Sequence, residues 1–82
     1  MKIFVTGGSG FIGSNFIINN LKTDEHAILN YDKLTYAGNE ANLVSISDSS
    51  NYQFTKGDIC DRDTLNKVIF EFQPHAIVNF AA

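Results

Sequence analysis

The sequence contains few of the residues that build cross-linked, basic or membrane-spanning proteins. Cys60 is the only cysteine in 82 residues, which excludes an internal disulfide and a zinc site made of several cysteines. Arg62 is the only arginine and the formal net charge is −3, so a basic surface for nucleic acid is not expected. No apolar run approaches the ~20 residues that cross a membrane or the ~7–15 of a signal peptide. We therefore expect a cytoplasmic protein without a metal site that binds neither nucleic acid nor membrane.

The residues that are present suit a folded core. Hydrophobic residues make up 44% of the chain and charged residues 18%, a balance typical of globular domains. A typical α/β domain has roughly 100–200 residues, however. We therefore expect residues 1–82 to be the amino-terminal part of a larger domain.

Strands and helices are predicted to alternate along the chain. Residues 3–5 and 27–32 are apolar runs typical of strands in a buried parallel sheet, and 52–55 alternates like a strand near a sheet edge. Residues 75–80 form a fourth apolar run. Residues 33–51 lack a sustained period, and we interpret them as a loop with a short helix around 39–44.

Two helices are predicted from apolar spacing. After residue 11, Ile12 and Phe16 and then Ile17 and Leu21 are spaced at i, i+4, which predicts one helical face. The second helix has the clearer apolar stripe. It is expected to begin at the capping residue Asp61, with Asp63 in its first turn, and to end at Pro74. The stripe consists of Leu65, Val68, Ile69 and Phe72.

This order predicts an α/β fold with a parallel sheet. Right-handed crossovers give the strand order 3-2-1-4, a partial Rossmann-type doubly wound sheet truncated after the fourth strand. The fourth strand is then an outer strand, and Ile77 and Val78 offer no charge or proline to protect its edge. We expect a longer protein whose next strand and helix cover this edge.

A glycine-rich loop joins the first strand to the first helix. The segment 6–13 (TGGSGFIG) fits both G-x-G-x-x-G and G-x-x-G-x-x-G. Gly7 permits a sharp turn, Gly10 has no Cβ to hold a pyrophosphate away, and Gly13 lets the helix pack closely on the sheet. The backbone N–H groups of residues 10–12 lie at the positive end of the helix, so the loop predicts a dinucleotide site.

The end of the second strand supplies an acidic residue. Asp32 follows Gly13 by nineteen positions, close to the ~20 expected for an acid that binds ribose. A carboxylate accepts hydrogen bonds from both ribose hydroxyls and repels a 2′-phosphate, which favours NAD over NADP, although Lys33 weakens this preference. The competing interpretation is that a tight turn merely needs glycine and that Asp32 is a solvated carboxylate.

Other polar residues have weaker claims to function. Asp58 follows the third strand and either faces the adenine together with Ile59 or only organises the turn. Tyr52 and Lys56 fit the Y-x-x-x-K pattern of a catalytic pair, but four residues on a strand span ~13 Å, so we exclude this pair. His26 and His75 stand at strand entries and are interpreted as structural.

Four segments together carry a resemblance to a known family. Residues 6–15 (TGGSGFIGSN), 31–39 (YDKLTYAGN), 56–61 (KGDICD) and 80–82 resemble the amino-terminal part of the dTDP-glucose 4,6-dehydratase family, which are extended short-chain dehydrogenases/reductases. The glycine loop is shared by the whole superfamily, whereas 32–39 is more particular to the dehydratases. Tyr31, where an aliphatic residue is more usual, is a mild departure.

The resemblance implies an NAD site and its residues. Phe11 and Ile12 would touch the pyrophosphate, and Asp58 and Ile59 would hold the adenine. The adenosine ribose would be wrapped by Asp32, Lys33, Leu34, Thr35 and Gly38. The nicotinamide side would be lined by Phe80, Ala81 and Ala82.

The resemblance also implies a reaction on a nucleotide sugar. In that family, NAD takes a hydride from C4 of dTDP-glucose, water is lost across C5 and C6, and the hydride returns to C6 to give dTDP-4-keto-6-deoxyglucose. The family's catalytic Thr, Tyr-x-x-x-Lys and Asp-Glu pair would lie beyond Ala82, so residues 1–82 are expected to bind cofactor without catalysing. A homodimer is implied as well. The alternatives are a nucleotide-sugar epimerase or decarboxylase, or a noncatalytic NAD-binding regulator.

Overall fold

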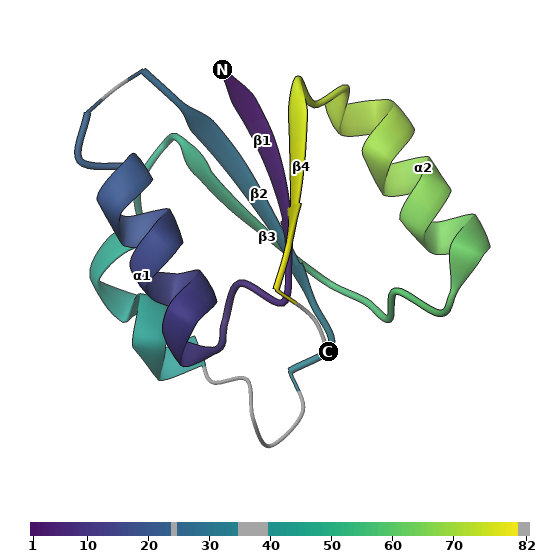
Figure 1. Ribbon diagram of the computed structural model, residues 1–82, viewed down its shortest axis with the longest axis horizontal. Coiled ribbons are helices and arrows are strands. Elements are labelled where there is room, and N and C mark those ends of the chain that lie inside the picture. Colours follow the sequence, from purple (N-terminus) through teal and green to yellow (C-terminus); the bar gives the residue numbers. More distant parts are fainter. Residues whose placement is uncertain (24, 35–39, 81–82) are drawn as a thin grey trace.

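The chain folds into a four-stranded sheet with helices on both faces (Figure 1). The computed structural model describes residues 1–23, 25–34 and 40–80. The elements in chain order are β1 (Lys2–Thr6), α1 (Phe11–Asn20), β2 (Ala27–Asp32), the 3₁₀ helix η1 (Glu40–Ile46), β3 (Tyr52–Lys56), α2 (Arg62–Phe72) and β4 (Ala76–Asn79). All neighbouring strands are parallel and their order is β3-β2-β1-β4. This confirms the predicted fold class, with β3 and β4 at the two edges.

Two apolar layers hold the helices to the sheet. Figure 1 shows α1 and η1 together on one side of the sheet and α2 on the other. On the side of α1 the buried residues are Ile3, Val5, Ile17, Ile28 and Leu43. On the side of α2 they are Phe4, Leu29 and Tyr31, against which Leu65, Val68, Ile69 and Phe72 pack. The stripe predicted for the second helix is therefore the face that contacts the sheet.

The predicted buried face of the first helix is wrong at one position. Ile17 is fully buried and Phe16 and Leu21 pack partly against the core, but Ile12 is 70% exposed. The buried residues of α1 are Gly13, Ser14 and Ile17. Ile12 stands in the first turn, where small residues rather than large ones meet the neighbouring loop. The i, i+4 spacing did not reveal that this turn packs by close backbone approach.

The ends of α2 agree with the sequence. Asp61 caps the helix, since its carboxylate accepts hydrogen bonds from the backbone N–H of Thr64 at 3.3 Å and from its hydroxyl at 2.8 Å. Gln73 ends it in the left-handed region, with φ of 52°, directly before Pro74. The expected short helix near residue 39 is η1, and its predicted start at 39 lies outside the described residues.

The strand register brings four strand ends to one edge of the sheet. Thr6 pairs with Tyr31 on one side and with Asn79 on the other, and Tyr31 pairs with Thr55. The residues that follow each strand therefore meet at the carboxyl edge, which is the lower edge in Figure 1. In doubly wound folds this is the edge that binds ligands. Among the described residues, no helix is both long and apolar enough to cross a membrane.

Candidate functional site

The glycine loop leaves β1 in a conformation that requires glycine at its first position. Gly7 has a φ of 71°, which side chains rarely adopt, and its N–H donates to the carbonyl oxygen of Tyr31 at 3.1 Å. The chain thus stays bonded to β2 while it turns toward α1. The steric role predicted for Gly7 is confirmed.

Gly13 packs the first turn of α1 directly on this loop. A Cβ atom placed on Gly13 would lie 2.7 Å from the carbonyl oxygen of Gly7 and 2.8 Å from Cα of Gly8. Both contacts are with backbone, which cannot rotate away as a side chain does. The close approach predicted for Gly13 is confirmed, but the prediction that it is made to the sheet is wrong, because Gly13 meets the loop backbone at Gly7 and Gly8.

No described side chain caps the amino end of α1. Its N-cap is Gly10, which has no side chain to cap it, and within the described residues its first turn contains no acidic residue. By contrast, α2 has Asp61 as a cap and Asp63 in its first turn. The first N–H groups of a helix lack intrahelical partners and carry partial positive charge. The start of α1 therefore has the properties that suit an anion, and it lies at the carboxyl edge of the sheet.

The residues that open α1 are unusually exposed for their type. Phe11 is 78% exposed and Ile12 is 70% exposed. Both were predicted to touch a pyrophosphate, and they stand beside the free N–H groups of this helix terminus. Two exposed apolar side chains beside such a terminus suit an amphipathic ligand with a phosphate group.

The carboxylate of Asp32 faces the glycine loop. Its Oδ2 accepts from the N–H of Ser9 at 2.8 Å, and its Oδ1 accepts from the N–H of Leu34 at 2.9 Å. A carboxylate has about four acceptor positions, so with the described residues alone each oxygen retains one for a further donor. Asp32 is therefore neither a free solvated group nor saturated. It ties the loop to the end of β2 and can still accept from ligand hydroxyls.

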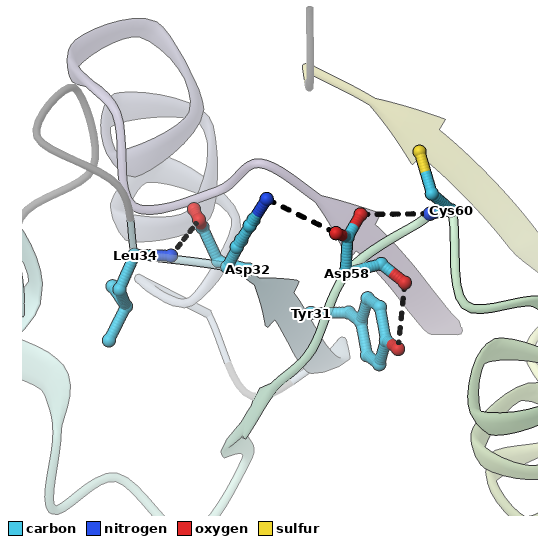
Figure 2. A network of polar contacts seen from close by, with 6 residues as sticks. Tyr31, Asp32, Leu34, Asp58 and Cys60 are labelled. Atoms are coloured by element: carbon cyan, nitrogen blue, oxygen red, sulfur yellow. Dashed lines mark hydrogen bonds and ion pairs between the residues drawn. The ribbon is translucent and has the colours of Figure 1, made fainter.

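Asp58 lies at the centre of a second polar network at the same edge (Figure 2). Its Oδ1 accepts from the N–H of Cys60 at 2.9 Å, and its Oδ2 lies 3.2 Å from Nζ of Lys33. The Cys60 bond, followed by Lys33, lowers the pKa of the Asp58 carboxyl. The sequence left open whether Asp58 organises its turn, and the structure shows that it does. Its predicted contact with adenine is not tested by this geometry.

Tyr31 connects this turn to the sheet interior. Its hydroxyl donates to the carbonyl oxygen of Asp58 at 3.3 Å, while its ring is fully buried and lies 5.8 Å from that of Phe4. A Cβ on Gly57 would collide with this ring. Burial first, and then the charges of Asp61 and Asp58, raise the pKa of the Tyr31 phenol. Tyr31 thus stabilises the turn after β3 by packing against Gly57 and bonding to Asp58.

The remaining predicted residues divide into two groups. Phe80 packs its ring 5.4 Å from that of Phe16, and its N–H donates to the carbonyl oxygen of Thr6 at 2.7 Å. The ring therefore packs partly against the core on the α1 side, and the backbone of Phe80 is bonded to the end of β1 at the carboxyl edge. Ile59 packs partly against the core on the α2 side. Four predicted residues lie outside the described part of the chain, namely Thr35, Gly38, Ala81 and Ala82.

The sequence analysis missed the residues that hold the glycine loop from within. Asn30 accepts from the N–H of Gly8 at 2.9 Å and donates to the hydroxyls of Ser9 at 3.0 Å and Tyr52 at 3.2 Å. Asn42 of η1 donates to the carbonyl oxygen of Ser9 at 2.9 Å. A signal was present, since an asparagine inside the apolar strand AILNYD must find partners when buried.

Residues set aside as nonfunctional have structural contacts. Tyr52 and Lys56 both lie on β3, where their spacing keeps the side chains apart, so the exclusion of a catalytic pair is consistent with the fold. Nδ1 of His75 accepts from the N–H of Lys2 at 2.9 Å, which joins the start of β4 to β1.

Comparison with known proteins identifies the family. The family model described as GDP-mannose 4,6 dehydratase matches residues 4–82. The chain belongs to this family. Curated relatives include the dTDP-glucose 4,6-dehydratases of Salmonella typhimurium and of Neisseria meningitidis, each 44% identical to the chain. Each alignment covers 99% or more of this chain but 23% of the relative, so the chain spans about a quarter of the length of these family members.

Solved structures of family members have the same arrangement of elements. The dTDP-glucose 4,6-dehydratase of Bacillus anthracis in complex with NAD is 51% identical, with a TM-score of 0.96 over all of this chain and 27% of its own. The dTDP-glucose 4,6-dehydratase of Streptomyces venezuelae with NAD bound is 39% identical, with a TM-score of 0.89 over 100% of this chain and 26% of its own. A UDP-Glc/GlcNAc 4-epimerase of Campylobacter jejuni is 31% identical, with a TM-score of 0.88 over 99% of this chain and 24% of its own.

Proposed function

We propose that this chain forms the NAD-binding unit of a dTDP-glucose 4,6-dehydratase. The observation that carries the proposal is the 2.8 Å bond between the Ser9 N–H and the Asp32 carboxylate. It joins the loop expected to bind the pyrophosphate to the acid expected to bind the ribose. The two parts of a dinucleotide site are thereby held in one unit at the carboxyl edge of the sheet.

The described residues fit the nucleotide. The bare amino end of α1 accepts the pyrophosphate, and the close approach of Gly13 to the loop leaves the helix terminus next to it. Asp32 has acceptor positions left for the two ribose hydroxyls. Asp58 and Ile59 are proposed to hold the adenine. Lys33 and Leu34, which directly follow β2, are proposed to contact the adenosine ribose together with Asp32.

Thr35 and Gly38 at the ribose and Phe80, Ala81 and Ala82 on the nicotinamide side complete the proposed site, as the resemblance implies. When bound, NAD would supply a hydride acceptor and then a hydride donor. The role of residues 1–82 is to bind and orient it.

The substrate class follows from the relatives. Curated dTDP-glucose 4,6-dehydratases match the chain from end to end, and solved dehydratases reach the highest identity among the structures compared above. We therefore propose dTDP-glucose as the substrate of the complete protein and dTDP-4-keto-6-deoxyglucose as its product. A nucleotide-sugar 4-epimerase is the second candidate, supported by the Campylobacter jejuni structure. A homodimer and a cytoplasmic location stay predictions.

The product of the complete gene tests the assignment directly. Incubation with dTDP-glucose is expected to yield the 4-keto-6-deoxy sugar nucleotide, detected by mass spectrometry as the loss of one water. Interconversion of UDP-glucose and UDP-galactose without dehydration would instead assign the epimerase. NAD binding without turnover of either substrate would favour the noncatalytic regulator.

The cofactor role of Asp32 is tested by Asp32→Ala in the same protein. Loss of the ribose contacts is expected to weaken NAD binding by about 1–3 kcal/mol, or about five- to 150-fold. NADP binding should weaken less, because the variant also removes the repulsion of the 2′-phosphate. Titration calorimetry measures both ligands, and Asp48→Ala, which removes an exposed carboxylate from the turn after η1, is the charge-matched control. An equal loss for NAD and NADP would assign Asp32 to loop support alone.

A further inference from the structure

Asn30 is a buried amide inside an apolar strand. It occupies the fourth position of β2, where it is 0% exposed, between the buried residues Leu29 and Tyr31. Burying an unpaired amide is costly, and an aliphatic residue at this position would pack without that cost. We therefore expect the contacts of the Asn30 amide to have a function.

Within the described part of the chain, the Asn30 amide bonds to the glycine loop and to the hydroxyl of Tyr52. Oδ1 accepts from the Gly8 N–H at 2.9 Å, and Nδ2 donates to Ser9 Oγ at 3.0 Å. Nδ2 also donates to the Tyr52 hydroxyl at 3.2 Å, which fixes the amide from β3. A Cβ on Gly8 would lie 2.5 Å from Oδ1, so the loop backbone rests directly on the amide.

Two further bonds hold the same short piece of loop. The Ser9 N–H donates to Asp32 and the Ser9 carbonyl accepts from Asn42, at 2.8 Å and 2.9 Å. Ser9 itself is 0% exposed. Gly8 and Ser9 are thus fixed from β2, from η1 and, through Tyr52, from β3. They immediately precede Gly10, which opens α1.

We infer that Asn30 is a positioning residue for the pyrophosphate of the dinucleotide. Because it is fully buried, it does not touch the ligand. It sets the path of the Gly8–Ser9 backbone, and that path sets the direction of the free N–H groups at residues 10–12. This inference rests on the proposed function, and it assigns to a side chain a part of phosphate recognition that the glycine motif alone does not explain.

Loss of the Asn30 amide should affect binding of the pyrophosphate but not binding of the nucleoside. Asn30→Ala in the product of the complete gene should leave the Gly8 N–H unpaired and let the loop shift. Affinity for ADP-ribose is then expected to fall at least tenfold, whereas affinity for adenosine should stay within twofold. Both are measured by titration calorimetry at a temperature where the variant is fully folded, with adenosine measured by competition.

Two conservative variants keep the test decisive if Asn30→Ala does not fold. Tyr52→Phe removes only the hydroxyl that steadies the amide, and we expect a two- to fivefold loss for ADP-ribose alone. Asn30→Asp keeps an acceptor for the Gly8 N–H, and the hydroxyls of Ser9 and Tyr52 can rotate to donate to it. Its ADP-ribose affinity should therefore be higher than that of Asn30→Ala. It should be no more than twofold lower than that of Tyr52→Phe.

The control is Asn20→Ala, which removes another partly buried asparagine bond, to the carbonyl oxygen of Phe16 at 2.8 Å, away from the loop. It should change neither affinity. If the variants lower the melting temperature while the ratio of ADP-ribose to adenosine affinity stays that of the parent protein, Asn30 is structural only and the inference is overturned. If the parent protein binds neither NAD nor ADP-ribose, the proposed function itself fails.

Discussion

Replacing Gly13 with alanine tests whether backbone packing governs the first turn of α1. Alanine favours helices over glycine by about 1 kcal/mol, so an unhindered site would gain stability. At Gly13 the new methyl group would lie 2.7 Å from the Gly7 oxygen and 2.8 Å from the Gly8 Cα, whereas ordinary contact begins at 3.4 Å. Neither neighbour can rotate away, so the helix and the loop must separate by several tenths of an ångström.

The two effects oppose each other, and the collision is the larger. Overpacking of this kind costs about 1–3 kcal/mol. After subtraction of the helix gain, Gly13→Ala is expected to destabilise the packing of α1 by about 1 kcal/mol. Because the displaced loop carries the helix terminus proposed to bind the pyrophosphate, NAD affinity should fall as well.

Hydrogen exchange of the α1 amides, read by mass spectrometry in the product of the complete gene, measures this local stability. A loss of about 1 kcal/mol speeds exchange about fivefold. Asn15→Ala, at an exposed position of the same helix, is the matched control and should slow exchange slightly. If Gly13→Ala also slows exchange, close packing does not restrict this position and the reasoning is refuted.

Two further predictions concern the turn after β3. Tyr31→Phe removes the long bond to the Asp58 carbonyl and should destabilise this turn by about 0.5–1 kcal/mol, measured by hydrogen exchange. Because the folded pKa of Tyr31 is raised above 10.0, its protonated form stabilises the fold below that pH and the contribution is lost as pH rises through the folded pKa. The tyrosinate absorbance of the variant should therefore lack one step that titrates above pH 10.0 in the parent. Asp58→Asn should release Lys33 and improve NADP binding relative to NAD at pH 7, as calorimetry would show. The folded pKa of Asp58 lies below 3.8, so the difference from the parent should persist down to that region and vanish only as pH falls through the folded pKa; a difference lost near pH 6 would contradict the assignment.

Local patterns were sufficient for most of the fold. The stripe from Leu65 to Phe72 and the cap at Asp61 are properties of neighbouring residues, and both were confirmed. The strand order followed from the alternation of strands and helices, because right-handed crossovers leave few arrangements. The turn at Gly7 was also predictable, since only glycine readily adopts its φ of 71°.

The candidate site was predictable only in outline. The motif identified Gly7, Gly13 and Asp32, but nothing in it indicated that Asp32 accepts from Ser9. Ile12 was assigned to a buried face because its spacing matched a stripe, yet the close packing of Gly13 leaves it exposed. Contacts such as these depend on how segments pack in three dimensions, which residue spacing along the chain does not encode.

By itself, the sequence determined the alternation of elements, the glycine turn and the acid at the end of β2, because each depends on conformational preferences within a few residues. Only the tertiary structure decided how the loop is held. In the sequence, Asn30 is a single polar residue in an apolar strand. In the folded chain, the parallel register places its amide within hydrogen-bonding distance of Gly8 and Ser9. Its role arises where β2, β3 and the glycine loop meet, and the buried amide is stable there because the loop and Tyr52 of β3 supply its partners.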